Sequence, residues 1–201
     1  PLIKRRLVAD FSEILSAEGV TALYVTHDQD EAMVVADRVS IMHEGAIVRT
    51  GDVDEVMGVP TSEWVAGFIG MDSSLRGRIA ASSEGIAEIA VEGAVLFACT
   101  DLPVGADVLV GIRPEDITLF EAGQALPASS ARNQLVMRVL AVEHRGSTDR
   151  VSLVADGLRL AAAVSRASSR ELGLERDART IASFKATAVR VAPAHDVPAG
   201  V

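Results

Sequence analysis

The sequence is poor in aromatic residues and in cations. Aromatic side chains make up 3% of its 201 residues, and 19 Lys and Arg stand against 28 Asp and Glu, a formal net charge of -9. Binding to nucleic acid draws its affinity from cations that neutralise phosphates and from aromatic rings on which bases stack. We therefore expect no nucleic acid among the partners of this chain.

The chain also lacks long apolar runs and a second cysteine. Its longest apolar stretches, "IAVEGAVLFA" and "LRLAAAV", are short or broken by charge, whereas a membrane-spanning helix needs about 20 consecutive apolar residues. Cys99 has no internal disulfide partner, and the opening "PLIKRRLVAD" has no apolar core of a secretory signal behind its basic residues. These features predict a soluble protein in a reducing cytosol.

Hydrophobic residues are abundant, at 49%, which suffices for one large or two modest domains. Residues 1–70 have an α/β pattern, in which a helical repeat stops at Gly19 and "TALYVT" follows. This short continuous apolar run predicts a strand buried on both faces of a parallel sheet. A second helix comes next, with Asp28 as its cap and Glu31 at the capping-box position. The first helix has its apolar positions at Leu7, Val8, Phe11, Ile14 and Leu15.

A hairpin and two short helices are predicted for the rest of this region. "RVSIMHEGAIVRTG" alternates apolar and polar residues around Glu44-Gly45, a pattern typical of a β-hairpin. One short helix is expected to begin at Asp52, and another follows Pro60-Thr61. We expect the second of these helices to bury Trp64, Val65, Phe68 and Ile69.

From residue 72 the sequence changes to short alternating segments separated by Gly, Pro and Asp, which predict a small β-barrel. "LPVGADVLVGIR" aligns without gaps with "LERDARTIASFK" at an offset of 72 residues, from Leu102 to Leu174, and places Arg113 opposite Lys185. This weak repeat indicates two related halves, at about 72–120 and 129–192. The domains expected are an α/β region at 1–70, an all-β barrel at 71–195 and a tail at 196–201.

His27 lies just past the predicted buried strand and just before a helix. In open α/β sheets, ligands bind at the carboxyl ends of the strands. A histidine at this place can contact a phosphate or a water, but a lone histidine more often caps a helix or packs, and the residues alone leave both interpretations open.

The stretch "GVTALYVTHDQDEAMVVADRVSIMHEGAIVRTGDVDEVMGVPTSEWVAGFIG" resembles the carboxyl-terminal part of an ABC-transporter ATP-binding subunit, in the importer branch that carries a regulatory tail. The resemblance implies that His27 is the switch-loop histidine, which contacts the γ-phosphate of ATP. It also implies ATP and Mg²⁺ as cofactors of the intact subunit, membrane permease subunits as partners, and a cytoplasmic place on the inner face of the cell membrane.

Three motifs of that family are missing from the sequence. There is no GxxxxGK[ST] phosphate loop, no "LSGGQ"-type signature and no apolar strand ending in Asp-Glu. Because backbone amides and a lysine are needed to cradle the phosphates, we expect this chain to be a fragment that by itself neither binds ATP and Mg²⁺ nor hydrolyses ATP.

"VGIRPEDITLF" resembles the regulatory OB-like tail of this importer branch, called the TOBE domain. Here a purely structural role is the simpler interpretation, because Pro114 fixes a bend and Arg113 can pair locally with Glu115.

Three further segments, "SARNQLVMRV", "AVSRASSRELGL" and "FKATAVRV", resemble in order the molybdate-binding Mop type of OB module. In that family hydroxyls, main-chain amides and two basic side chains hold the oxyanion, in sites that usually lie between modules or subunits. Residues 128–170 contain seven Arg against three acids, which favours steering of an anion. The resemblance assigns oxyanion binding to Ser130, Ala131, Arg132, Ser165, Ser168, Lys185 and Ala186, and no metal site is expected.

Each of these residues also has an ordinary interpretation. Lys185 can be a solvated lysine at a strand end, Ser165 and Ser168 can be turn and cap residues, and Arg132 can pair with Glu143 or Asp149. Together, the three segments favour the tail of the ATP-binding subunit of a molybdate or tungstate importer, which senses oxyanion and forms a homodimer. The alternative is the same subunit of a ferric iron, sulfate, polyamine or sugar importer, with a tail that dimerises without binding a ligand.

Overall fold

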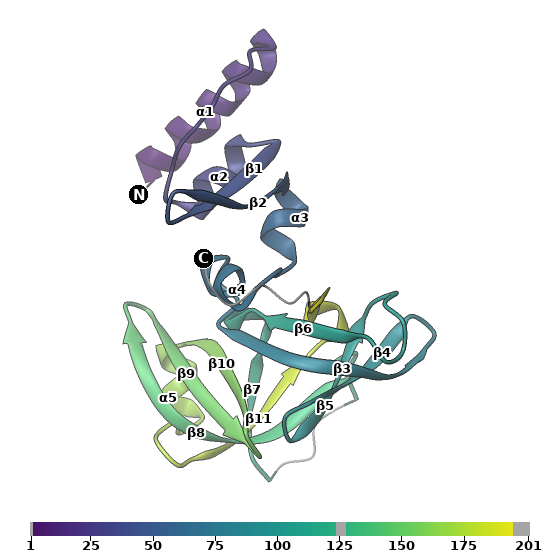
Figure 1. The fold of residues 1–201 in the computed structure, drawn as a ribbon. Coiled ribbons are helices and arrows are strands. Elements are labelled where there is room, and N and C mark those ends of the chain that lie inside the picture. Colours follow the sequence, from purple (N-terminus) through teal and green to yellow (C-terminus); the bar gives the residue numbers. More distant parts are fainter. Residues whose placement is uncertain (1, 124–127, 195–201) are drawn as a thin grey trace. The chain divides into compact units, whose positions relative to one another are not determined.

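The computed structural model describes residues 2–123 and 128–194. It divides into two compact units, Pro1–Gly58 and Val59–Val201 (Figure 1), which are described separately below. The domain boundary predicted at residue 70 stays a prediction. In the structure, helix α4 (Glu63–Phe68) contacts strand β3 (Ser73–Ser83), so α4 belongs to the second compact unit.

The first unit consists of helix α1 (Leu2–Glu18), α2 (Gln29–Val35), the hairpin β1 (Arg38–His43) and β2 (Ala46–Asp52), and α3 (Val53–Gly58). The predicted hairpin is confirmed, with φ of 48° at Glu44 and 80° at Gly45 in its turn. Two successive positive φ angles match the right-handed twist of the flanking strands. Among the described helices of the whole chain, none is long and apolar enough to cross a membrane.

The strand predicted for "TALYVT" is wrong. Residues 21–26 have no regular secondary structure, and Leu23 and Val25 are 94% and 86% exposed. A strand in a parallel sheet needs neighbours on both sides for its backbone hydrogen bonds. In the described part of this unit, the only strands are β1 and β2, and these pair with each other.

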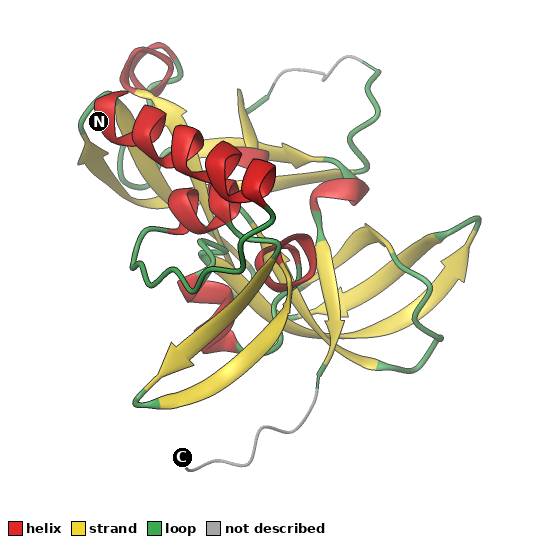
Figure 2. Ribbon diagram, turned by 90° about the horizontal axis from the view of Figure 1, so that it is seen from above, coloured by secondary structure: helices red, strands yellow, loops and turns green. Residues whose placement is uncertain are grey.

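The second unit is built mainly of strands. Strands are the yellow arrows in Figure 2. One five-stranded antiparallel sheet has the order β12-β6-β3-β4-β5, and the other has the order β10-β9-β8-β11-β7. A single hydrophobic core draws residues from both sheets. The elements after β3 are β4 (Ile86–Val91), β5 (Ala94–Cys99), β6 (Asp107–Ile112), η1 (Pro114–Asp116), β7 (Thr118–Glu121), β8 (Asn133–Arg145), β9 (Thr148–Ala155), β10 (Leu158–Ser165), α5 (Arg166–Glu171), β11 (Arg179–Phe184), η2 (Ala186–Ala188) and β12 (Arg190–Pro193).

Helix α4 differs in detail from the prediction. Its N-cap is Ser62, whose hydroxyl accepts a hydrogen bond from the Val65 amide at 3.1 Å. Val65 and Ile69 are buried as expected, but Trp64 and Phe68 are 38% and 36% exposed and stack on each other with ring centroids 5.4 Å apart. Residues four apart share one face of a helix, and here that face lies away from the core.

The internal repeat is confirmed in the second unit and extends beyond the aligned segments. Strand β6, η1 and β7 are repeated by β11, η2 and β12 at an offset of 72 residues, as from Asp107 to Arg179. Strand β3 is repeated by β8 at an offset of 60, from Ser73 to Asn133. Each of these two long strands has a β-bulge at the corresponding place, at Ile79/Ala81 and at Val139/Ala141.

The two halves exchange their last strands. Strand β7 follows β6 in the chain but pairs with β11 of the other sheet, and β12 follows β11 but pairs with β6. Each sheet therefore contains a strand from the other half, and neither half completes its own sheet.

Helix α5 is present in the second half alone. The β4–β5 hairpin is repeated by β9–β10 at an offset of 64, from Ile86 to Arg150, whereas the next strands are offset by 72. The extra eight residues fall between β10 and β11, where α5 lies against β9 and β10.

Candidate oxyanion site and switch loop

The loop that carries His27 is held by a buried carboxylate. Glu31, 7% exposed, accepts hydrogen bonds from the Thr26 hydroxyl at 2.7 Å and from the Tyr24 hydroxyl at 3.0 Å. Thr26 in turn accepts a bond from the Asp28 amide at 3.0 Å. These bonds fix the backbone on both sides of His27, whose side chain is exposed.

Asp28 caps helix α2 as predicted, since its carboxylate accepts a bond from the Glu31 amide at 3.4 Å. The Glu31 carboxylate bonds to hydroxyls that precede the helix, and the sequence had indicated only a capping-box role for it. The two hydroxyl partners, Tyr24 and Thr26, escaped sequence analysis because they lay in the expected buried strand.

The residues of this unit do not fit a bound ATP by themselves. His27 is the one residue that the family resemblance assigns to the nucleotide, and the sequence has no glycine-rich lysine loop to cradle phosphates. Among the described residues, no cluster of three His, Cys, Asp or Glu is placed to hold a metal ion. The assignment of His27 to the γ-phosphate stays a prediction.

Two of the three expected oxyanion segments meet at one end of a strand pair. Asn133 opens β8 and pairs with Phe184, the last residue of β11. Arg132 precedes this pair and Lys185 follows it, so the two cations flank the same end of β8 and β11. Both side chains are exposed, and neither makes an ion pair with a described residue. We call Ser130, Ala131, Arg132, Lys185 and Ala186 the cationic corner.

The remaining members of the cationic corner are Ser130, Ala131 and Ala186, which carry no charge. Ser130 is exposed, Ala186 is buried in η2, and the Ala131 amide donates to the Ser129 hydroxyl at 3.3 Å. The Ala131 amide is thus engaged locally, whereas the Ser130 hydroxyl has no hydrogen bond within the described structure.

The third segment lies elsewhere. Ser165 pairs with Thr148 across β9–β10, and Thr148 pairs with Arg145, the last residue of β8. The cationic corner is at the first residue of β8, so the strand's 13 residues, about 40 Å along the strand at ~3.3 Å per residue, separate the two segments. In Figure 1, β8 runs from the side of β5 to the side of α5. The chain does not bring Ser165 and Ser168 to the corner through strand pairing.

Ser165 and Ser168 bond to each other. Ser165 caps α5 by accepting a hydrogen bond from the Ser168 amide at 3.0 Å, and the two hydroxyls are 2.8 Å apart. The ordinary interpretation, turn and cap residues, is confirmed as a structural role, and each hydroxyl oxygen keeps acceptor or donor capacity for one further partner.

The structure places two buried polar residues beside these segments. Asn133, 2% exposed, clamps β5 of the other sheet, because its side chain accepts from the Phe97 amide at 2.8 Å and donates to the Phe97 carbonyl at 2.9 Å. The segment "SARN" contains this asparagine, for which the sequence predicted no role. An asparagine just ahead of an apolar strand was the available signal.

Asp149 is the other buried residue, at 1% exposure. Its carboxylate is 2.7 Å from His144 Nδ1 and 3.6 Å from Arg166 Nε. The hydrogen bond from His144 lowers the pKa of Asp149, burial opposes this, and Ser169 and Arg166 lower the pKa further. Arg132 pairs with neither of the acids that the sequence suggested for it, since Glu143 pairs with Arg145 at 3.2 Å.

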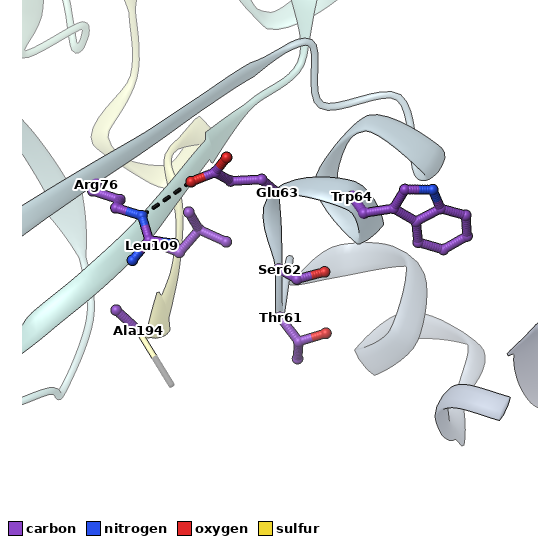
Figure 3. Close-up of a pocket in the computed structure, with 7 residues that line it drawn as sticks. All are labelled: Thr61, Ser62, Glu63, Trp64, Arg76, Leu109 and Ala194. Atoms are coloured by element: carbon purple, nitrogen blue, oxygen red, sulfur yellow. Dashed lines mark hydrogen bonds and ion pairs between the residues drawn. The ribbon is translucent and has the colours of Figure 1, made fainter. Parts of the chain in front are cut away.

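A small pocket lies apart from the cationic corner, beside α4 (Figure 3). Its volume is about 210 Å³, below the roughly 300–1,000 Å³ of ordinary small-molecule sites. Arg76 in its wall is paired with Glu63 at 3.0 Å, and the Trp64 ring is turned away from Arg76. With its cation already neutralised, this pocket is a poor site for an anion. Its lining residues are Thr61, Ser62, Glu63, Trp64, Arg76, Leu109 and Ala194.

Comparison with known families decides what the second half is. The sequence pattern of the TOBE domain matches residues 129–191. Residues 129–191 are a TOBE domain. It begins at the cationic corner and includes α5 and η2, so all residues predicted for the oxyanion lie in it.

Beyond the TOBE domain, nearly the whole chain resembles ATP-binding proteins of importers. It is 36% identical over 192 residues to the molybdate/tungstate import ATP-binding protein WtpC of Pyrococcus horikoshii, covering 94% of this chain and 52% of the relative. It is 38% identical over 140 residues to the sulfate/thiosulfate import ATP-binding protein CysA 2 of Chromobacterium violaceum, covering 70% and 36%. Other relatives are named for import of Fe(3+) and of spermidine/putrescine.

These comparisons confirm the resemblance to the ATP-binding subunit of an ABC importer with a TOBE domain. The chain spans about half the length of the WtpC relatives that it matches, 52% in each of two cases. The names of the relatives differ in what is imported, so the comparisons establish the subunit class and leave the imported substrate unassigned.

One solved structure bears on the fold. The cytoplasmic molybdate-binding protein ModG, crystallised with molybdate bound, superposes with a TM-score of 0.52 at 24% identity, covering 61% of this chain and 96% of that one. At this identity the likeness concerns the fold. The expected fold class, an α/β fragment followed by an all-β OB-like barrel, is confirmed.

Proposed function

We propose that this chain is part of the ATP-binding subunit of an ABC importer for molybdate or tungstate, and that its TOBE domain binds the imported oxyanion at the cationic corner. One observation carries the proposal. Arg132 and Lys185, two cations without ion-pair partners in the described structure, flank the same strand end in a chain of net charge -9. Like charges repel each other at short range unless an anion joins them.

The chemistry of the corner suits a tetrahedral dianion. A lysine and an arginine offset its charge through hydrogen bonds about twice as strong as neutral ones, and hydroxyls such as that of Ser130 add directional donors. No acidic residue belongs to the corner, and a carboxylate there would repel the ligand. The names of the WtpC relatives and of ModG agree with molybdate or tungstate as the ligand.

We further propose that a second copy of the chain completes the site. Ser165 and Ser168 lie at the far end of β8 from the corner, so within one chain they do not reach the same ion through strand pairing. In a homodimer, α5 of one copy would face the cationic corner of the other, and the reciprocal contact would form a second site. The intact subunit would bind ATP and Mg²⁺. It would associate with the membrane permease at the cytoplasmic face of the membrane.

Calorimetry of the 201-residue chain with tungstate, molybdate and sulfate tests this proposal. We expect tungstate and molybdate to bind, and Lys185→Ala or Arg132→Ala to weaken binding roughly 10- to 100-fold, the loss typical of a charged hydrogen bond. Arg176→Ala is the matched control, since Arg176 is exposed in a turn near the middle of β8 and belongs to neither segment. Absence of heat with all three anions at dimer-forming concentrations would refute oxyanion binding.

A second candidate function is dimerisation without a ligand. It is favoured by one observation, that the Ser165 and Ser168 hydroxyls already bond to each other. Sedimentation of the Lys185→Ala and Arg132→Ala variants separates the two functions. Loss of tungstate binding with the dimer intact supports a sensor, whereas loss of the dimer without any tungstate binding in the parent chain supports a scaffold.

A further inference from the structure

The internal repeat gives the cationic corner a counterpart in the first half. Ser73 opens β3 and pairs with the last residue of β6, as Asn133 opens β8 and pairs with the last residue of β11. The residue just before the strand is Asp72 in the first half and Arg132 in the second. The counterpart of Lys185 is Arg113, so the first-half corner, Asp72 and Arg113, has an acid in place of one of the two cations.

The backbone around the two positions is held in the same way. The Ser73 hydroxyl accepts a hydrogen bond from the Ala161 amide at 2.9 Å, and the Asn133 side chain accepts one from the Phe97 amide at 2.8 Å. Ala161 and Phe97 occupy corresponding places in β10 and β5. The two corners thus share their supporting contacts and differ in charge.

Asp72 makes an ion pair that has no counterpart beside the cationic corner. Its carboxylate is 2.7 Å from Arg150 Nη1, with side chains 27% and 24% exposed. Arg150 in β9 has as its counterpart in β4 the apolar Ile86. At the corresponding positions, Arg132 and Ile86 cannot form an ion pair, so the fold itself does not require one.

From this asymmetry we infer that Asp72 is a built-in anion that occupies Arg150 and keeps oxyanions out of the first-half corner. The inference rests on the proposed function only in assigning oxyanion binding to the other corner. A carboxylate tethered beside its cation is present at a local concentration far above that of a free ion, and its negative charge also repels an approaching dianion. Each chain then binds an oxyanion at the cationic corner alone, although its fold contains two corresponding corners.

Asp72→Asn in the 201-residue chain tests the inference, with Asp107→Asn as the matched control. Asp107 also pairs with an arginine, Arg78, at 2.8 Å in the same unit, but both side chains are exposed and lie outside either corner. Anomalous diffraction from crystals soaked in tungstate locates the ion, and calorimetry counts it. We expect Asp72→Asn to add a tungstate at Arg150 and to double the number bound per chain, while Asp107→Asn leaves the parent pattern unchanged.

The Asp72→Asn,Arg150→Ala double variant should not bind the added tungstate. This loss would show that Arg150 holds that ion. Tungstate at Arg150 in the parent chain, or no added tungstate in Asp72→Asn, would overturn the inference whatever happens at the cationic corner. Added tungstate in Asp72→Asn with none at the cationic corner of the parent would instead sustain this inference and refute the proposed function.

Discussion

At the scale of single residues, the buried polar groups of the TOBE domain act as clamps. An ionised carboxylate only accepts hydrogen bonds, so the 2.7 Å contact between Asp149 and His144 requires the proton on Nδ1 of the imidazole. Asp149 also lies beside Arg166 and Ser169 at the start of α5. It therefore joins the β8–β9 hairpin to the helix that carries Ser165 and Ser168.

The stability of this region should depend on acid through Asp149. Because its folded pKa lies below the unfolded value of about 3.9, its contribution to stability is fully present above that unfolded value and disappears as pH falls through the lower folded pKa. We expect the melting temperature of the parent chain to fall more steeply than that of Asp149→Asn once the pH drops below about 4. The exposed Asp101, as Asp101→Asn, is the control and should track the parent. Parallel curves for parent and Asp149→Asn would contradict this assignment.

Residue types alone predicted some of these roles and missed others. Asp28 was identified as a cap because its bond is local, three residues along the chain. The clamp by Asn133 escaped prediction because its partner, Phe97, is 36 residues away in the other sheet. That Arg132 has no ion pair with a described residue was equally hard to predict, because Glu143 and Asp149 lie beside other cations.

At the scale of elements, two hairpin turns meet closely. Gly93, in the β4–β5 turn, has a φ of +69°, and a Cβ placed on it would lie 1.9 Å from the Asp156 carbonyl oxygen of the β9–β10 turn. These are corresponding turns of the two halves, so the repeat packs against itself here. A glycine is required both for the backbone conformation and for the close approach.

Gly93→Ala should accordingly destabilise the second unit by roughly 2–4 kcal/mol, the sum of a left-handed backbone cost and a steric clash. Gly85→Ala separates the two effects, because Gly85 has a φ of +76° but no neighbouring atom within 4 Å of the place that an added Cβ would take. We expect this control to cost only about 1 kcal/mol in urea unfolding. Equal losses in the two variants would show that the turns do not touch in solution.

Elements defined by local pattern were predicted well, and those defined by distant partners were not. The β1–β2 hairpin has its turn signal in sequence, and the repeat of β6 and β11 was visible as a gapless alignment. "TALYVT" has the composition of a buried strand but no strand beside it among the described residues. The exchange of β7 and β12 escaped prediction, because four-residue strands contain too little pattern to specify a partner.

At the scale of the whole molecule, the exchanged strands make the two halves of the barrel interdependent. Strand β12 completes the first sheet and β7 completes the second, while the core contains residues from both. A TOBE domain at residues 129–191 thus depends on the preceding half for β7 and for a place to dock β12.

Residues 129–201, produced alone, should therefore fold only as a dimer. The edge of β11 that loses β7 would accept β12 of a second copy, because β12 repeats β7 at an offset of 72 residues, from Thr118 to Arg190. Each copy would supply β12 to the other, so the pseudo-symmetry of the chain would become a true two-fold axis. Sedimentation equilibrium measures the mass, and residues 129–189, which lack β12, serve as the control that should neither dimerise nor give a cooperative melt. A folded monomer of residues 129–201 would contradict this interdependence of the two halves. It would show that the unpaired edge of β11 and the unpaired strand β12 destabilise the isolated half too little to prevent folding.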